Sequence, residues 1–145
     1  MNEASQATDS TEALTAALGR SDLARAVERL AGVPVLVLGD IMLDRFVYGT
    51  VERISPEAPI PVLRIAEETA MLGGAGNVLR NLAALGARPQ GIAVIGEDAA
   101  GAEVEALARA CVAPAGGTVD LLRSPARATT LKDRFIAAGQ QLLRV

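Results

Sequence analysis

The 145-residue sequence contains no histidine and no tryptophan, and it has one cysteine, one tyrosine and two phenylalanines. The lack of histidine excludes catalytic triads built on an imidazole and the usual zinc sites, so carboxylates are the expected proton acceptors. Cys111 has no partner for a disulfide within the chain. Its place on an apolar helical face predicts that it packs in the core.

Long apolar runs and strong net charge are also missing. No hydrophobic segment reaches the length that spans a membrane, and residues 1–9 lack the basic and apolar regions of a signal peptide. The formal net charge of −3 argues against nucleic acid as a partner. Half of the residues are hydrophobic, which is enough for one domain with a buried core. We therefore expect a cytoplasmic protein with a small-molecule ligand and no nucleic-acid or membrane partner.

Residues 1–32 are expected to form a helical extension in front of the main domain, which is residues 33–145. A capping box formed by Asp9 and Glu12 predicts a short first helix. A second helix with one apolar face is predicted to end at Gly32. The extension carries no residue pattern that indicates chemistry.

Continuous apolar runs predict the strands of the main domain. Val33–Leu38 is rich in branched residues and is typical of a parallel-sheet strand covered on both faces. Gln90–Ile95 has the same character, and a shorter strand is predicted at Val119–Arg123. Between the last two, Asp98 is placed to cap a helix that runs to about Cys111. This order of strands and helices favours an α/β layer structure.

Two further strands, Arg45–Val51 and Ile60–Ile65, flank a proline-rich segment. Its prolines exclude a central strand and indicate a sheet edge or an excursion from the main sheet. Phe46 and Tyr48 lie here, and exposed apolar strands need cover. We interpret residues of about 45–66 as a lid that also contacts a second subunit. An ordinary edge hairpin is the alternative.

The segment 73–86 has the pattern of a glycine turn that feeds a helix. Gly73 and Gly74 leave the backbone free of side chains at the turn, so that a ligand could approach it closely. Asn77, just inside the helix, adds an amide that both donates and accepts hydrogen bonds. A Walker A loop is excluded because Gly-Lys-Ser/Thr is absent, and a dinucleotide fingerprint is excluded because Leu79 is too large. A plain helix cap with close packing is the alternative.

Charged residues suggest a ligand site near the ends of the strands. Asp44 follows the first predicted strand, at the edge where open α/β sheets bind ligands. Lys132 and Arg134 share one face of a predicted hairpin whose turn lies near Gly139. Such a pair can hold one phosphate, with arginine binding bidentately and lysine as a point charge. A solvated face with scattered charge is the alternative for the pair.

Taken together, these segments resemble the N-terminal half of the ribokinase-like (PfkB) carbohydrate kinases. Gly39 with Asp44 five positions later, a lid, and Gly73-Gly74 followed by Asn77 carry the resemblance. Other segments resemble a narrower group, the kinases that phosphorylate D-glycero-β-D-manno-heptose 7-phosphate at its anomeric position, on the route to ADP-heptose and lipopolysaccharide core. These segments are 39–45, 53–62 and 130–144, and Arg-Ile-Ser-Pro-Glu-Ala-Pro in the second is the most specific.

The resemblance implies a three-layer αβα sandwich with a β lid, of which this chain supplies the N-terminal part. Asp44 and Asn77 would hold sugar hydroxyls, and the glycine turn would let the sugar lie against the backbone. A sugar that already carries a phosphate needs a basic pair, for which Lys132 and Arg134 are the candidates. The implied substrate-binding residues are Asp44, Gly73, Gly74, Asn77, Lys132, Arg134 and, from the lid, Arg53.

The resemblance also implies ATP and Mg²⁺ as cofactors of the intact enzyme, and a homodimer formed through the lid. The catalytic aspartate of the family lies in a Gly-Ala-Gly-Asp motif, which this sequence lacks. Gly74-Ala75-Gly76-Asn77 cannot replace it, because asparagine does not accept a proton. We therefore assign no catalytic residue and no metal ligand, and expect the chain alone to be inactive. The alternatives are a non-catalytic sugar-phosphate-binding or dimerisation module, or a kinase of the family for another sugar.

Overall fold

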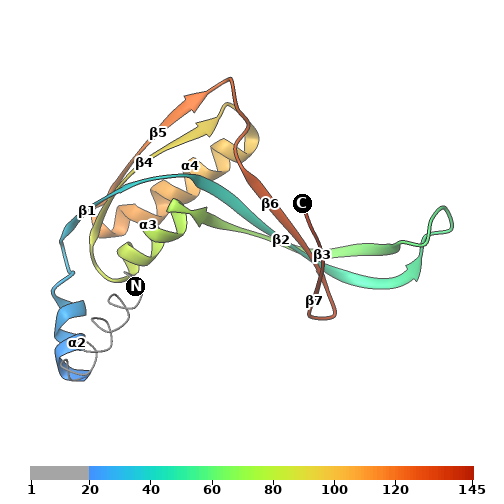
Figure 1. The fold of residues 1–145 in the computed structure, drawn as a ribbon, viewed down its shortest axis with the longest axis horizontal. Helices are drawn as coiled ribbons and strands as arrows, with labels where there is room; N and C mark the ends of the chain where they lie inside the picture. The colour runs from blue at the N-terminus through green and yellow to red at the C-terminus, as the bar shows by residue number, and fades with distance from the viewer. Residues whose placement is uncertain (1–19) are drawn as a thin grey trace, which may run out of the picture.

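The computed structural model describes residues 20–145, which form an elongated molecule with helices at one end and a projecting β-hairpin at the other (Figure 1). The short helix predicted to start near Asp9 lies outside the described residues. Within residues 20–145, no helix is long and apolar enough to cross a membrane. The elements in order are α2 (Arg20–Glu28), β1 (Pro34–Leu38), β2 (Ile41–Ile54), β3 (Pro61–Gly74), α3 (Ala75–Ala84), β4 (Arg88–Gly96), α4 (Ala99–Val112), the 3₁₀ turn η1 (Ala113–Ala115), β5 (Thr118–Ser124), β6 (Leu131–Ala137) and β7 (Gln140–Arg144).

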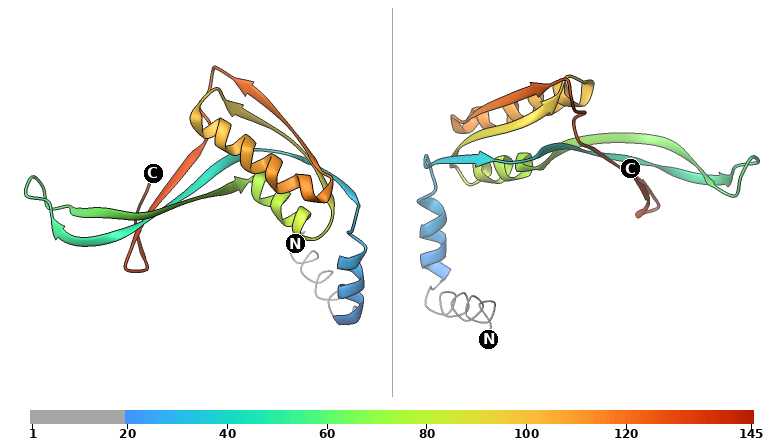
Figure 2. Two further views of the ribbon diagram at one scale, coloured as in Figure 1. Left: turned by 180° about the vertical axis from the view of Figure 1, so that it is seen from behind. Right: turned by 45° about the horizontal axis from the view of Figure 1, so that its top comes forward.

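The first sheet has the strand order β1-β4-β5, and its neighbouring strands are parallel. Helices α3 and α4 pack against one face of it (Figure 2). The core lies between these two layers, where Ile95 of β4 and Val104 of α4 are completely buried. The predicted α/β layer structure is confirmed, and it follows from the alternating strands and helices of the sequence.

The opposite face of this sheet is open within residues 20–145. Leu36, Leu38 and Leu122 lie on it, with exposed fractions of 63%, 77% and 61%. The prediction that β1 is covered on both faces is therefore wrong for the described part of the chain. The apolar run predicts a parallel strand correctly, but the run is the same whether or not a second layer of helices covers it.

The second sheet has the order β3-β2-β6-β7 and contains the predicted lid. β2 and β3 are antiparallel strands of 14 residues each, so the predicted bounds, 45–51 and 60–65, are too short. The added part of β3 includes polar residues such as Glu68 and Thr69, which become a strand by pairing with Val47 and Phe46. β3 is an edge strand and begins at Pro61, as the prolines predict.

β6 lies beside β2 in parallel, a pairing that the sequence did not predict. The chain enters β6 through the buried Thr129, whose Oγ1 accepts the N–H of Gly96 at 2.8 Å. The N–H of Thr129 in turn donates to Asp98 Oδ2 at 2.8 Å. Asp98 also caps α4, as predicted, by accepting the N–H of Gly101 at 2.7 Å. One carboxylate therefore joins the start of α4 to the start of β6.

Three smaller predictions are also confirmed. Gly86 directly follows Leu85, the C-cap residue of α3; its φ is 80°, and its N–H donates to the carbonyl of Ala83, so it ends the helix in the left-handed conformation. The β6–β7 turn is Ala138-Gly139, with φ values of 50° and 76°, as a two-residue type I′ turn requires. Cys111 packs against the core, and its burial raises the pKa of its thiol.

Replacing Asp98 with alanine should lower the melting temperature, because two backbone N–H groups lose their acceptor. The hydrogen bonds from Thr129, and then that from Gly101, hold the pKa of Asp98 below its usual value of 3.8. Its stabilising effect is therefore complete above pH 3.8 and is lost as the pH falls through the lower pKa of the folded state. Circular dichroism melting curves of wild type and Asp98→Ala should converge at low pH.

Asp120→Ala, which removes an exposed carboxylate of β5, is the matched control and should leave the melting temperature almost unchanged. A difference between wild type and Asp98→Ala that is the same at neutral and at acidic pH would contradict this account of the cap.

Candidate functional site

The candidate site is built on the two faces of β2. Ile41, Leu43 and Val47 point into the core, so Asp44 and Phe46 lie on the other face of the strand. The Asp44 side chain is half-buried and lies over the end of β3. A Cβ atom on Gly73 would be only 2.5 Å from Asp44 Oδ2. The missing side chain at Gly73 is therefore what makes room for the carboxylate.

Gly74 turns the chain from β3 into α3. Its φ of 57° and ψ of −130° belong to a region that only glycine enters readily. No side chain caps the first turn of α3, and the N–H of Ala75 donates to the carbonyl of Asp40 at 2.8 Å. Asn77, in the first turn, accepts a hydrogen bond at Oδ1 from Arg80 Nη2 at 2.7 Å. The turn thus joins the start of the helix to the chain between β1 and β2.

The two predicted cations lie on the same face as Asp44. The parallel register pairs Asp44 with Lys132 and Phe46 with Arg134. Arg134 Nη1 donates to Asp44 Oδ1 at 2.9 Å, and the two side chains are 21% and 18% exposed. The guanidinium also lies 4.9 Å from the centre of the Phe46 ring, a cation–π contact. The structure therefore brings a carboxylate, two cations and a bare glycine together.

Arg53 does not join this group. It lies nine positions beyond Asp44 on β2, which is roughly 30 Å along a strand at about 3.3 Å per residue. That part of β2 belongs to the projecting hairpin (Figure 1). The arrangement of residues 20–145 therefore gives Arg53 no direct role beside Asp44.

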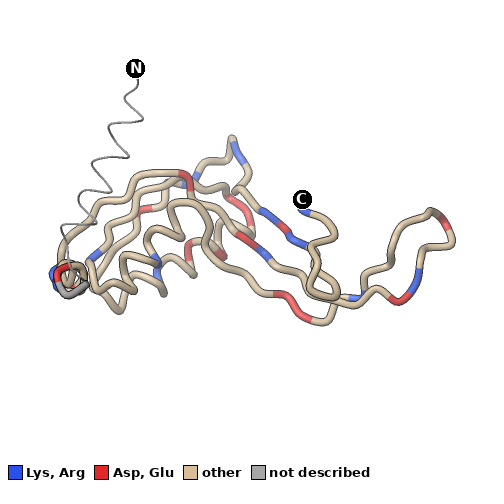
Figure 3. The backbone as a smooth tube through the Cα atoms, turned by 60° about the horizontal axis from the view of Figure 1, so that its bottom comes forward, with Lys and Arg blue, Asp and Glu red and all other residues tan. Residues whose placement is uncertain are grey.

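A second set of charges lies on the opposite face of the same strands. Arg45 reaches Asp133 Oδ1 at 3.8 Å and Glu103 Oε2 at 3.7 Å, so it links β2, β6 and α4. Figure 3 shows basic, acidic and basic residues in succession along β6. Because side chains alternate between the two faces of a strand, the two basic residues lie on one face and the acidic residue lies on the other. Within the described part of the chain, no three histidine, cysteine, aspartate or glutamate side chains are placed to hold a metal ion.

Two contacts at the site were missed by sequence reasoning. One is at Phe46, in the segment predicted as the lid: its ring lies under Arg134 and stacks on Tyr48 with ring centres 6.3 Å apart. The other is the hydrogen bond that Arg80 donates to the side-chain amide oxygen of Asn77. The alternation of residue types within each strand can be read from the sequence. The sequence does not show which strands are neighbours, and the contact between Phe46 and Arg134 depends on the pairing of β2 with β6.

Curated relatives match most of the chain, although no protein-family model does. The bifunctional protein HldE of Paramagnetospirillum magneticum is 58% identical over 126 residues, which are 86% of this chain and 25% of that protein. The D-beta-D-heptose 7-phosphate kinase of Bordetella bronchiseptica is 51% identical over 118 residues, which are 81% of this chain and 36% of that protein. The chain thus spans only about a quarter to a third of the length of these relatives.

Solved structures agree with these matches. A carbohydrate kinase from Agrobacterium tumefaciens has a TM-score of 0.60 and 28% identity, covering 78% of this chain and 34% of that one. The chain has the fold of the ribokinase-like (PfkB) carbohydrate kinases. Phosphofructokinase-2 from Escherichia coli in complex with fructose-6-phosphate has a TM-score of 0.54 and 25% identity, covering 79% and 34%. Residues 20–145 contain the segment predicted as the lid, the parallel sheet and the helical layer formed by α3 and α4.

Gly73→Ala should displace Asp44, because the new Cβ would lie 2.5 Å from Asp44 Oδ2 and 2.8 Å from Met42 Cγ. Overpacking of this kind lowers the free energy of unfolding by about 1–3 kcal/mol, which urea denaturation can measure. Gly39→Ala is the control, because its Cβ would meet only the Cβ of Ala75 at an ordinary 3.5 Å. Equal losses in the two variants would show that the space at Gly73 is not special.

Proposed function

We propose that the chain is the acceptor-sugar part of a kinase that transfers phosphate from ATP to the anomeric hydroxyl of D-glycero-β-D-manno-heptose 7-phosphate. The product, the 1,7-bisphosphate, would serve ADP-heptose and lipopolysaccharide core synthesis in the cytoplasm. The observation that carries the proposal is the 51% identity with the D-beta-D-heptose 7-phosphate kinase of Bordetella bronchiseptica over 81% of this chain. Since the match spans 36% of that protein, the role proposed for this part is to hold the sugar.

The proposed roles follow from the chemistry of each group. The Asp44 carboxylate accepts hydrogen bonds from two sugar hydroxyls, while the Asn77 amide both donates and accepts. The missing side chain at Gly73 leaves room for the Asp44 carboxylate beside the proposed position of the sugar. Lys132 and Arg134 hold the 7-phosphate. The contact between Asp44 and Arg134, and the register of Asp44 with Lys132, support a single site for polyol and phosphate.

Phosphoryl transfer further needs a base for the attacking hydroxyl and donors for the charge on the moving phosphoryl group. The Gly-Ala-Gly-Asp motif that supplies both in this family is absent from the sequence, so neither role is assigned here. The family implies ATP and Mg²⁺, which together supply the phosphoryl group and neutralise its charge. The acidic side chains of residues 20–145 do not form a group that fits a metal ion. What remains for these residues is to bind and orient the sugar.

Isothermal titration calorimetry of the full chain with D-glycero-β-D-manno-heptose 7-phosphate tests the proposal. Binding is expected, and Asp44→Asn should weaken it by about 10- to 100-fold, since a hydrogen bond to a charged group contributes about 1.5–3 kcal/mol. Asp120→Asn, in an exposed part of β5, is the control. An ADP-release assay should detect no turnover of ATP by the chain alone.

Absence of any heat of binding, or an affinity that Asp44→Asn does not change, would contradict the proposed site. Tighter binding of an unphosphorylated sugar would instead favour a kinase of the family for another substrate.

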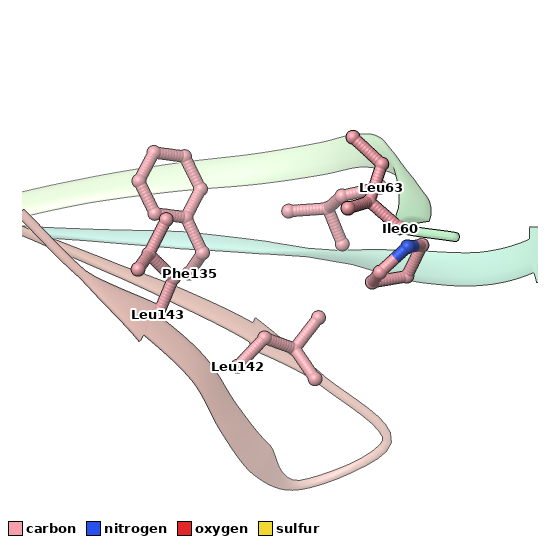
Figure 4. A pocket seen from close by; sticks show the side chains of 6 residues that line it. Ile60, Leu63, Phe135, Leu142 and Leu143 are labelled. Atoms are coloured by element: carbon pink, nitrogen blue, oxygen red, sulfur yellow. The ribbon is translucent and has the colours of Figure 1, made fainter. Parts of the chain in front are cut away.

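One observation favours a second role, as a dimerisation module. The lid has an apolar hollow of about 390 Å³ between its hairpin tip and the β6–β7 hairpin, whose side chains point toward one another in Figure 4. The hollow lies on the face opposite Asp44, because its Phe135 alternates with Arg134 along β6. It is lined by Ile60, Pro61, Leu63, Phe135, Leu142 and Leu143. The proposed homodimer contact through the lid is this hollow rather than the covered Phe46 ring.

Sedimentation velocity tests this dimer. Leu143, which is 56% exposed, should be buried in the dimer, so Leu143→Glu should yield monomers at concentrations where the wild type is dimeric. Tyr48→Glu is the control on the other face, where Tyr48 is 38% exposed, and should leave the dimer intact. The reverse result would move the contact to the Phe46 face, and a monomeric wild type would refute the dimer.

A further inference from the structure

We propose that Arg134 determines which ligands Asp44 accepts: it occupies the carboxylate in the free protein, and the phosphate of an incoming sugar phosphate draws it away. The inference rests on the proposed function, because it takes a sugar phosphate as the ligand. It adds to that function a physical reason for a preference for phosphorylated over unphosphorylated sugars.

The geometry of the ion pair leaves it open to exchange. The bond between the two groups joins one donor, Arg134 Nη1, to one acceptor, Asp44 Oδ1, at 2.9 Å. It is not the pair of parallel bonds that makes arginine–carboxylate contacts strong. The other carboxylate oxygen, Oδ2, lies over Gly73, where the proposed sugar approaches. One oxygen thus faces the sugar position while the other is held by Arg134.

The strength of the pair is also suited to exchange. Both side chains are about four-fifths buried, at 21% and 18% exposed, so water screens their attraction only in part, but a single hydrogen bond of 2.9 Å joins them. A phosphate carries more charge than a carboxylate and offers three strong acceptor oxygens. The guanidinium additionally rests 4.9 Å from the centre of the Phe46 ring, which keeps it on the sheet face whichever anion it binds. A phosphate that reaches Arg134 can therefore replace Asp44 as its partner.

Lys132 provides the first contact for that phosphate. It is in register with Asp44 on the neighbouring strand and two positions before Arg134. It takes part in none of the ion pairs formed by residues 20–145, so its charge is available. A sugar without a phosphate would be attracted neither by the charge of Lys132 nor by that of Arg134. It would have to displace Arg134 from Asp44 with hydroxyl groups alone, which bind a carboxylate more weakly than a guanidinium does.

The exchange can be tested without any sugar. The side-chain carboxyl carbon of Asp44 is followed by ¹³C NMR in the full chain, with Asp44→Asn used for assignment, during titration with inorganic phosphate. The Asp44 signal should shift in the wild type and stay fixed in Arg134→Gln. Sodium chloride of equal ionic strength is the control for screening. An Asp44 signal that does not respond to phosphate in the wild type would overturn the inference.

The consequence for selectivity is tested by calorimetry with heptose 7-phosphate and with the unphosphorylated heptose. The wild type should prefer the phosphorylated sugar by about 100-fold, and Arg134→Gln should reduce the preference to about 10-fold or less. Part of that change should come from tighter binding of the unphosphorylated sugar, because Asp44 is free. Lys132→Gln is the matched control: it should weaken only the phosphorylated ligand.

The outcomes separate the two proposals. If Arg134→Gln weakens both sugars equally, Arg134 only positions Asp44, and the exchange is refuted. If inorganic phosphate shifts the Asp44 signal in the wild type but neither sugar binds, the exchange stands and the proposed substrate is wrong.

Discussion

The alternation of side chains along β2 is the constraint on which the rest of the structure depends. Leu43 is completely buried and Ile41 almost so, while Asp44 is on the other face. A shift of the strand by one residue would expose Leu43 and bury the Asp44 carboxylate in the core, a large cost for an ionised group. The apolar core therefore sets the register of β2 against β3 and β6. The charges of the candidate site are placed by that register.

The candidate site also depends on a contact that lies outside it. Thr129 is tied to Gly96 and Asp98 by two hydrogen bonds of 2.8 Å each. These bonds hold the connection between the two sheets at the point where β6 begins, so that β6 runs beside β2 and brings Arg134 to Asp44. Asp98, which caps α4 locally, thereby also supports the long-range pairing of β2 with β6. Both the fold and the candidate site depend on this carboxylate.

The described part of the chain has apolar surface on both of its sheets. On the three-stranded sheet, Leu36 and Leu38 are 63% and 77% exposed, and parallel sheets in proteins normally have both faces covered. On the four-stranded sheet, Leu143 of β7 is 56% exposed beside the apolar hollow. Patches of this kind mark sites of association. We therefore propose that the four-stranded sheet has two roles on its two faces, with charges for a ligand on one face and apolar side chains for a partner on the other.

By itself, the sequence determined the features that depend on neighbouring residues: the order of strands and helices, the cap at Asp98, the glycine turns, and the residue types of the site. It did not determine which strands lie side by side, because the pairing of β2 with β6 joins segments 90 residues apart that leave no local pattern. Only the tertiary structure decided that β2 and β3 are 14 residues long, that Arg53 is remote, and that Arg134 binds Asp44. Each of these results from strand pairing and packing, which act between residues distant in sequence.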